Sequence, residues 1–225
     1  MQKLERDAIR GLFMRSLMLA VMIFVPAGRI DYWQAWIFLV VFISCSVLLT
    51  AYLWKNNKTL LEQRVYGGYR HETRKIQKVI MLSLSIISIG QVICSVLDYR
   101  FNSHHPSPII VLLGDVLIIA GFYITLLVFR ENNHASATVE AHPGQTIVAT
   151  GPYAVVRHPM YAGGFLTFCG IPLALASYAG LAFMILMVPL FIARLYNEEA
   201  ILLAEVPAYR SYTLLTPWRL LPKIF

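Results

Sequence analysis

Long apolar runs, separated by short polar segments, dominate the hydropathy pattern of the chain. Residues 33–54 and 79–97 contain no charged side chain, and residues 109–129 contain only Asp115. A helix needs about 20 apolar residues to cross the hydrocarbon core of a bilayer, and each run meets that length. Because the apolar residues fill these runs and do not keep to one helical face, the pattern predicts membrane-spanning helices.

Three further apolar segments are shorter or interrupted. Residues 11–27 contain Arg15, whose charged end can extend to the membrane surface. The basic start before this segment fits a retained helix, which we favour, and also a signal peptide. Residues 160–176 and 178–193 are separated by Ser177 and predict a helical hairpin.

Together these segments predict an all-α, polytopic membrane protein with about six transmembrane helices. We expect a single integral membrane domain over residues 1–225. Residues 1–129 would form the N-terminal helices, and residues 130–225 would form the functional half, with its site on the C-terminal hairpin. Composition agrees, because only 14% of the residues are charged while soluble domains have about 25%.

The basic residues lie between the apolar segments. If both termini are cytoplasmic, every Lys and Arg except Arg29 and Arg100 falls on the cytoplasmic side. This is the positive-inside bias of membrane proteins, so the net charge of +7 does not indicate a nucleic acid partner. We therefore expect a multi-pass membrane protein with both termini in the cytoplasm.

Two polar segments near the C-terminus contain the residues best suited to chemistry. In the second, Arg194 and Glu198 are four positions apart on one predicted helix and share a face, which is also typical of a simple ion pair at the membrane surface. In the first, Gly151-Pro152 and His158-Pro159 interrupt the chain. Gly163-Gly164 follow and would let their helix approach another backbone closely.

Read together, the two segments resemble a known enzyme family. The motif Gly151-Pro-Tyr-x-x-x-Arg-His-Pro-Met-Tyr161-x-Gly precedes Arg194-x-x-x-Glu-Glu199, and the tail contains Tyr209-x-x-Tyr212. This combination resembles the isoprenylcysteine carboxyl methyltransferase family, and membrane methyltransferases that act on phospholipid amines look similar. Met160 departs from the Ser that eukaryotic members often have there.

The resemblance implies an S-adenosylmethionine-dependent methyltransferase with a lipophilic acceptor among the membrane lipids: a prenylcysteine-like or isoprenoid carboxylate, or a lipid amine. Arg194 would bind the acceptor and, with Glu198, form the catalytic pair. The cofactor-binding residues implied by position are Gln145, Thr146, Ile147, Val148, Tyr153, His158, Pro159, Met160, Tyr161 and Glu198.

Three alternatives remain open. A membrane NADPH-dependent reductase resembling sterol reductases would have a similar C-terminal architecture. A metal-dependent lipid hydroxylase would use His134, His142 and His158 with Glu131 and Glu140, but the histidine spacing forms no cluster and we expect no metal. A non-enzymatic transporter or assembly factor is suggested by Asp115 within a predicted span, although a position near the helix end also suits a capping role.

Overall fold

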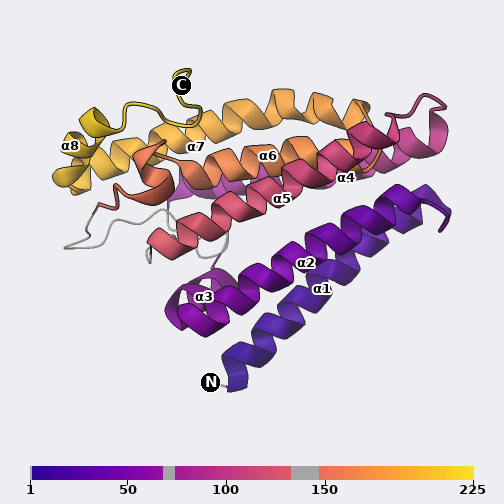
Figure 1. Cartoon of the computed structure of the whole chain (residues 1–225), viewed down its shortest axis with the longest axis horizontal. Coiled ribbons are helices and arrows are strands. Elements are labelled where there is room, and N and C mark those ends of the chain that lie inside the picture. The colour runs from indigo at the N-terminus through magenta and orange to yellow at the C-terminus, as the bar shows by residue number, and fades with distance from the viewer. Residues whose placement is uncertain (1, 68–73, 133–146) are drawn as a thin grey trace.

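The computed structural model describes residues 2–67, 74–132 and 147–225, and every regular element in these ranges is helical (Figure 1). The elements in chain order are α1 Gln2–Ala27, α2 Trp33–Asn56, α3 Lys58–Tyr66, α4 Lys75–Phe101, α5 Pro108–Glu131, the 3₁₀ helix η1 Gly151–Ala154, α6 Pro159–Ala174, the 3₁₀ helix η2 Ala179–Phe183, α7 Met184–Glu205 and α8 Ala208–Leu215.

Five helical segments of the described residues are long and apolar enough to cross a membrane. They are Lys3–Ala27, Trp33–Asn56, Lys75–Phe101, Pro108–Glu131 and Ala179–Glu205. The sixth apolar segment forms α6, which has 16 residues. At 1.5 Å per residue α6 is about 24 Å long, less than the hydrocarbon core of about 30 Å. The expected all-α polytopic membrane fold is confirmed, with one helix shorter than its neighbours.

Helix α6 packs along α5 at backbone contact distance. A Cβ atom on Gly163 would lie 2.7 Å from the carbonyl oxygen of Gly121, and one on Gly170 would lie 2.5 Å from that of Gly114. The two glycines of each helix are seven residues apart, so they share one face. Small residues on a shared face let membrane helices approach closely. The close approach expected at Gly163-Gly164 is therefore confirmed at Gly163, where its partner is α5, and is wrong for Gly164, whose Cβ would meet only the Phe191 ring.

This contact gives a testable prediction of stability. Gly121→Ala would place a methyl group against the Gly163 carbonyl and the Thr167 side chain, and such overpacking costs about 1–3 kcal/mol. Gly164→Ala is the matched control, because its Cβ would meet only the Phe191 ring at 4.0 Å. We expect a lower thermal unfolding temperature in detergent for the first variant only. If Gly121→Ala and Gly164→Ala unfolded at the same temperature, the stability of the α5–α6 contact would not depend on glycine at position 121.

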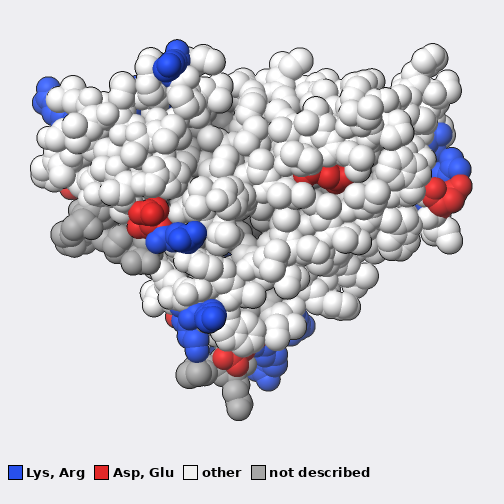
Figure 2. Space-filling model, in the orientation of Figure 1, with Lys and Arg blue, Asp and Glu red and all other residues white. Residues whose placement is uncertain are grey.

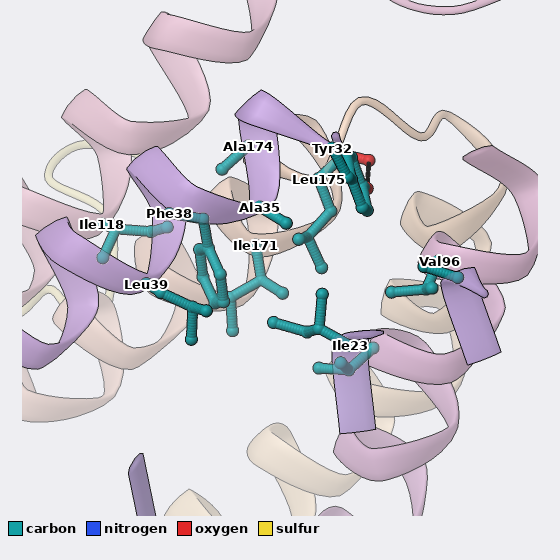
Figure 3. Close-up of a cluster of buried hydrophobic side chains, with 12 residues drawn as sticks. Ile23, Tyr32, Ala35, Phe38, Leu39, Val96, Ile118, Ile171, Ala174 and Leu175 are labelled. Atoms are coloured by element: carbon teal, nitrogen blue, oxygen red, sulfur yellow. Dashed lines mark hydrogen bonds between the residues drawn. The ribbon is translucent and has the colours of Figure 1, made fainter. Parts of the chain in front are cut away.

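The largest apolar core holds the bundle together at the end where α6 finishes. Ile23 of α1, Phe38 of α2 and Ile118 of α5 are fully buried there, and Figure 3 shows them converging with residues of α4 and α6. Tyr32 donates a hydrogen bond from its hydroxyl to the Leu175 carbonyl. This bond joins the start of α2 to the chain that follows α6.

At the opposite end, α3 closes a second apolar cluster. Leu60 and Leu61 of α3 are buried against Val128 and Phe129 of α5, with Met160 packed beside them. Figure 1 shows α3, α8 and both chain termini toward this end, and in Figure 2 no Lys or Arg is visible over the middle of the helices. Met160 at the start of α6 therefore lies at the same end of the bundle as α3.

Candidate active site

Arg194 and Glu198 lie one turn apart on α7, and both reach the hydroxyl of Tyr161 on α6. Arg194 Nε donates to Tyr161 Oη at 2.8 Å, and Tyr161 Oη donates to Glu198 Oε2 at 2.6 Å. The two side chains share a face, as their spacing predicts, with the tyrosine hydroxyl between them. This arrangement holds the carboxylate of Glu198 in one orientation while keeping it half-buried.

The backbone of α7 is fixed at the same point by α4. Gln77 is fully buried, and its Nε2 donates to Asn197 Oδ1 at 2.9 Å and to the Arg194 carbonyl at 3.4 Å. These bonds set the position of the turn that carries Arg194 and Glu198. The geometry of the pair therefore depends on three helices, α4, α6 and α7.

The neighbouring carboxylate, Glu199, has a different environment. It is buried and binds Arg157 Nε at 2.7 Å and Arg219 Nε at 2.9 Å. His158 Nε2 lies 3.3 Å from its Oε1 atom, and the Tyr209 hydroxyl donates to that oxygen at 3.4 Å. A buried carboxylate with two guanidinium partners is neutralised locally, so Glu199 is a structural centre of the site.

The Glu199 centre ties the C-terminal tail to the start of α6. The second guanidinium nitrogen of Arg157 donates to the carbonyls of Thr216 and Pro217, each at 2.9 Å. The backbone amide of Arg157 donates to Trp218, and that of His158 to Arg219. Residues 216–219 therefore pack against the segment that leads into α6.

The other side of the site is formed by α3, α5 and η1. The Tyr153 hydroxyl accepts a hydrogen bond from Asn132 Nδ2 at 2.9 Å. Burial raises the pKa of Tyr153 to about 12, so this hydroxyl stays protonated at neutral pH. The Tyr153 carbonyl in turn accepts from the hydroxyls of Tyr212 and Thr216, which joins η1 to α8 and the tail.

Arg64 of α3 also lies here. One of its terminal nitrogens is 3.0 Å from the sulfur of Met160, and its Cζ atom lies 4.6 Å from the centre of the Phe129 ring. Burial lowers the pKa of Arg64 to about 10, with the charge of Arg194 adding to the shift. The guanidinium remains protonated at neutral pH, so this side of the site is cationic.

The residues that the resemblance assigns to the cofactor are spread over several parts of the structure. His158, Pro159, Met160 and Tyr161 form the start of α6, where Pro159 occupies an early position that needs no amide hydrogen. Tyr153 lies beside Met160, and Ile147 packs in the cluster around Tyr209 and Tyr212. Val148 is half-buried, whereas Gln145 and Thr146 lie outside the described residues.

The residues behind the alternative functions are only partly described. His134, Glu140 and His142 lie outside the described ranges, and within those ranges no group of three His, Cys, Asp or Glu side chains is arranged to hold a metal ion. Asp115 is buried on α5, and neither carboxylate oxygen has a hydrogen-bond partner among the described residues. Asp115 lies inside α5 and caps none of the described backbone amides, so the prediction of a helix-capping role is wrong.

Sequence reasoning missed several members of the site. Arg157 and Glu199 stand inside the motifs that carry the resemblance, but nothing in their spacing indicates that they pair with each other. Arg64 and Arg219 belong to basic segments that a positive-inside bias explains fully. Only the fold brings α3 and the tail to the same place.

Comparison with known families bears on the same region. Residues 109–206 match the sequence profile of the family described as phospholipid methyltransferase. This range is less than half of the chain, and it contains all but the first residue of α5 and the whole of η1, α6 and α7, with Tyr161, Arg194 and Glu198. That family belongs to the same membrane methyltransferase group as the isoprenylcysteine enzymes. No curated protein gives a significant match to the chain.

The profile match and the apolar helices together support a membrane methyltransferase. They do so at the level of the group. The isoprenylcysteine carboxyl methyltransferase family in particular stays a prediction.

Proposed function

We propose that the chain transfers a methyl group from S-adenosylmethionine to a lipophilic acceptor at the membrane surface. The observation that carries this proposal is the array of Arg194, Tyr161 and Glu198 inside the matched residues. Glu198 offers the negative charge that a sulfonium cation requires, in a half-buried place where Coulomb attraction exceeds that in water. Arg194 offers a cation on the other side of the same hydroxyl.

The residues at the start of α6 suit the cofactor in size and chemistry. Tyr161 bonds to Glu198, and the half-buried Met160 precedes it at the start of α6. An aromatic ring and a thioether fit the flat ring and the sulfonium of this ligand. We also assign the buried His158 and Pro159 to cofactor binding. We assign Gln145, Thr146, Ile147, Val148 and Tyr153 to the same binding role. S-adenosylmethionine supplies an electrophilic methyl group and leaves as S-adenosylhomocysteine.

The protein's part in such a reaction is to position the two reactants and to exclude water. An acceptor amine forms the new N–C bond through its lone pair and afterwards releases one proton, whereas an acceptor carboxylate forms an O–C bond and releases none. Arg194 would hold an oxyanion of the acceptor through paired N–H donors, a geometry that lysine lacks. Glu198 would orient the cofactor and form no covalent bond.

The proposal also covers the chemical class of the acceptor and the side of the membrane on which the site lies. The description of the matched family names phospholipids and so favours a lipid acceptor with a phosphate headgroup, for which we propose an amine as the methylated group. A prenylcysteine-like or isoprenoid carboxylate is the other class. Both termini lie toward the site end of the bundle (Figure 1). This position supports a cytoplasmic site with cytoplasmic termini in a bacterial inner membrane, where a soluble cofactor and a membrane-borne acceptor can meet.

Ligand-induced stabilisation tests the cofactor directly. Purified protein in a non-ionic detergent is heated with S-adenosylmethionine, S-adenosylhomocysteine or NADPH. A ligand at 100 times its dissociation constant stabilises the folded state by about 2.7 kcal/mol, so we expect a higher unfolding temperature with both adenosyl ligands. Radiolabelled methyl transfer into lipid extracts then identifies the acceptor. Stabilisation by NADPH alone would favour the reductase alternative and contradict the proposal.

A further inference from the structure

Helices α1 and α2 run side by side (Figure 1) and form a cavity between them, with one residue of α5 as part of its wall. The cavity has a volume of about 260 Å³. None of the described residues that line it takes part in the candidate active site, and among them only Phe122 lies within the matched residues 109–206. The cavity is therefore a separate feature, made by the N-terminal helices.

Small side chains on the two helices leave this space open. Ser16 of α1 and Ser46 of α2 both line the cavity, and each donates its hydroxyl to the carbonyl four residues earlier, at 2.9 Å and 2.8 Å. Thr50 does the same at 2.8 Å. Because these hydroxyls already have partners in their own helices, the wall offers little to a water molecule, which needs two to four polar partners. The space suits an alkyl chain.

The inner end of the cavity is closed by apolar side chains. Leu19, Phe42 and Phe122 pack against the largest apolar core, and the two rings meet edge to face with 5.3 Å between their centroids. Phe42 and Thr50 both line the cavity and are eight positions apart, which corresponds to about 12 Å along α2. One leaflet of a bilayer has about 15 Å of hydrocarbon, so the cavity can hold most of one lipid chain within a leaflet.

The outer end of the cavity has a positive charge. Arg15 is the one charged side chain among the described residues that line it. A terminal nitrogen of its guanidinium lies 3.7 Å from the place that a Cβ on Gly11 would take, so the side chain extends back toward the start of α1 and the membrane surface. In the described part of the chain no carboxylate forms an ion pair with it. A cation at this depth attracts the phosphate of an anionic lipid.

We propose that this cavity binds one acyl chain of an anionic phospholipid, whose phosphate lies against Arg15. The chain would extend from Arg15 toward the rings of Phe42 and Phe122, in the direction that a lipid takes within its leaflet. Filling the space adds apolar contacts between α1 and α2 that neither helix makes alone. The lipid is thus a bound component of the folded protein, and the inference does not depend on the proposed methyl transfer.

Native mass spectrometry of the whole protein in a non-ionic detergent tests the site by counting retained lipids. The probes are phosphatidylglycerol, phosphatidylcholine with the same chains, and oleate. We expect one phosphatidylglycerol to be retained at lower concentrations than phosphatidylcholine. Arg15→Gln should weaken its binding about 10- to 100-fold, the loss expected when a charged hydrogen bond is removed. Ser46→Leu should fill the cavity and abolish retention of both phospholipids.

Two matched variants control for changes of charge and size elsewhere. Arg10→Gln removes an exposed basic residue of α1 that does not line the cavity. Ser85→Leu enlarges an exposed serine of α4 whose hydroxyl also donates to a carbonyl four residues earlier, at 2.8 Å. Both variants should retain phosphatidylglycerol like the unchanged protein.

Three results would overturn the inference. Equal retention of phosphatidylglycerol by Ser46→Leu and Ser85→Leu would show that the lipid binds elsewhere. Equal retention of the two phospholipids, unchanged by Arg15→Gln, would exclude recognition of the anionic headgroup. Retention of oleate in place of phosphatidylglycerol would identify a fatty acid site. Stabilisation by adenosyl ligands reports on the candidate active site alone and should be the same in Arg15→Gln as in the unchanged protein, so the two proposals can fail separately.

Discussion

Replacing Glu199 with alanine is expected to destabilise the protein by about 3–5 kcal/mol, the usual cost of removing one partner from a buried ion pair. Arg157 would be left buried without its anion, and Arg219 would lose its 2.9 Å contact. The tail would lose its attachment to the start of α6. Thermal unfolding in detergent measures the loss, and limited proteolysis of the C-terminal segment detects release of the tail.

Glu205→Ala is the matched control, because Glu205 is an exposed carboxylate on the same helix that pairs with Arg74 at 2.7 Å. Exposed pairs contribute about 0–1 kcal/mol, so this variant should unfold close to the unchanged protein. If Glu199→Ala were equally harmless, the Glu199 centre would not hold the tail.

Removing Glu198 should affect cofactor binding and leave the fold intact. Glu198 is half-buried, and its contact with Tyr161 is one hydrogen bond. Loss of a charged interaction corresponds to about 10- to 150-fold in affinity, so Glu198→Ala should abolish stabilisation by S-adenosylmethionine, whose sulfonium is charged, at ordinary concentrations. Binding titrations and unfolding temperatures of the free protein measure the two effects separately.

Arg194→Ala provides the complementary result. It should preserve stabilisation by S-adenosylhomocysteine and lower the rate of methyl transfer, because the proposal places Arg194 on the acceptor. Tyr161→Phe removes the hydroxyl between the two and should weaken both functions. Full methyl transfer by both the Glu198 and Arg194 variants would show that the residues are wrongly assigned, even if the protein is a methyltransferase.

Much of the architecture could be predicted from the pattern of apolar runs. Residues 33–54 and 109–129 lie within α2 and α5, since uncharged runs of this length have few alternatives to a helix in a membrane. The closest neighbour of α6 could not be obtained in this way. The preference of α6 for α5 depends on glycines of both helices at matching heights, which a single sequence does not reveal.

The site was predictable where its residues are close in sequence. Arg194 and Glu198 follow helical periodicity, and Tyr161 belongs to the quoted motif. The position of Arg64 beside Met160 could not be predicted, because it depends on α3 packing back against α5. Arg219 was unpredictable for a similar reason, since its pairing with Glu199 requires the tail to fold over α7.

The partners of Glu199 come from both sides of it along the chain, and this has a consequence for biosynthesis. Arg157 precedes Glu199 by 42 positions, whereas Arg219 follows it by 20. During translation α7 is therefore complete before Arg219, which pairs with the buried Glu199 carboxylate, has been made. The start of α6 can reach its final form only after residues 216–219 have emerged and docked, so ligand binding would be acquired after these residues have been made.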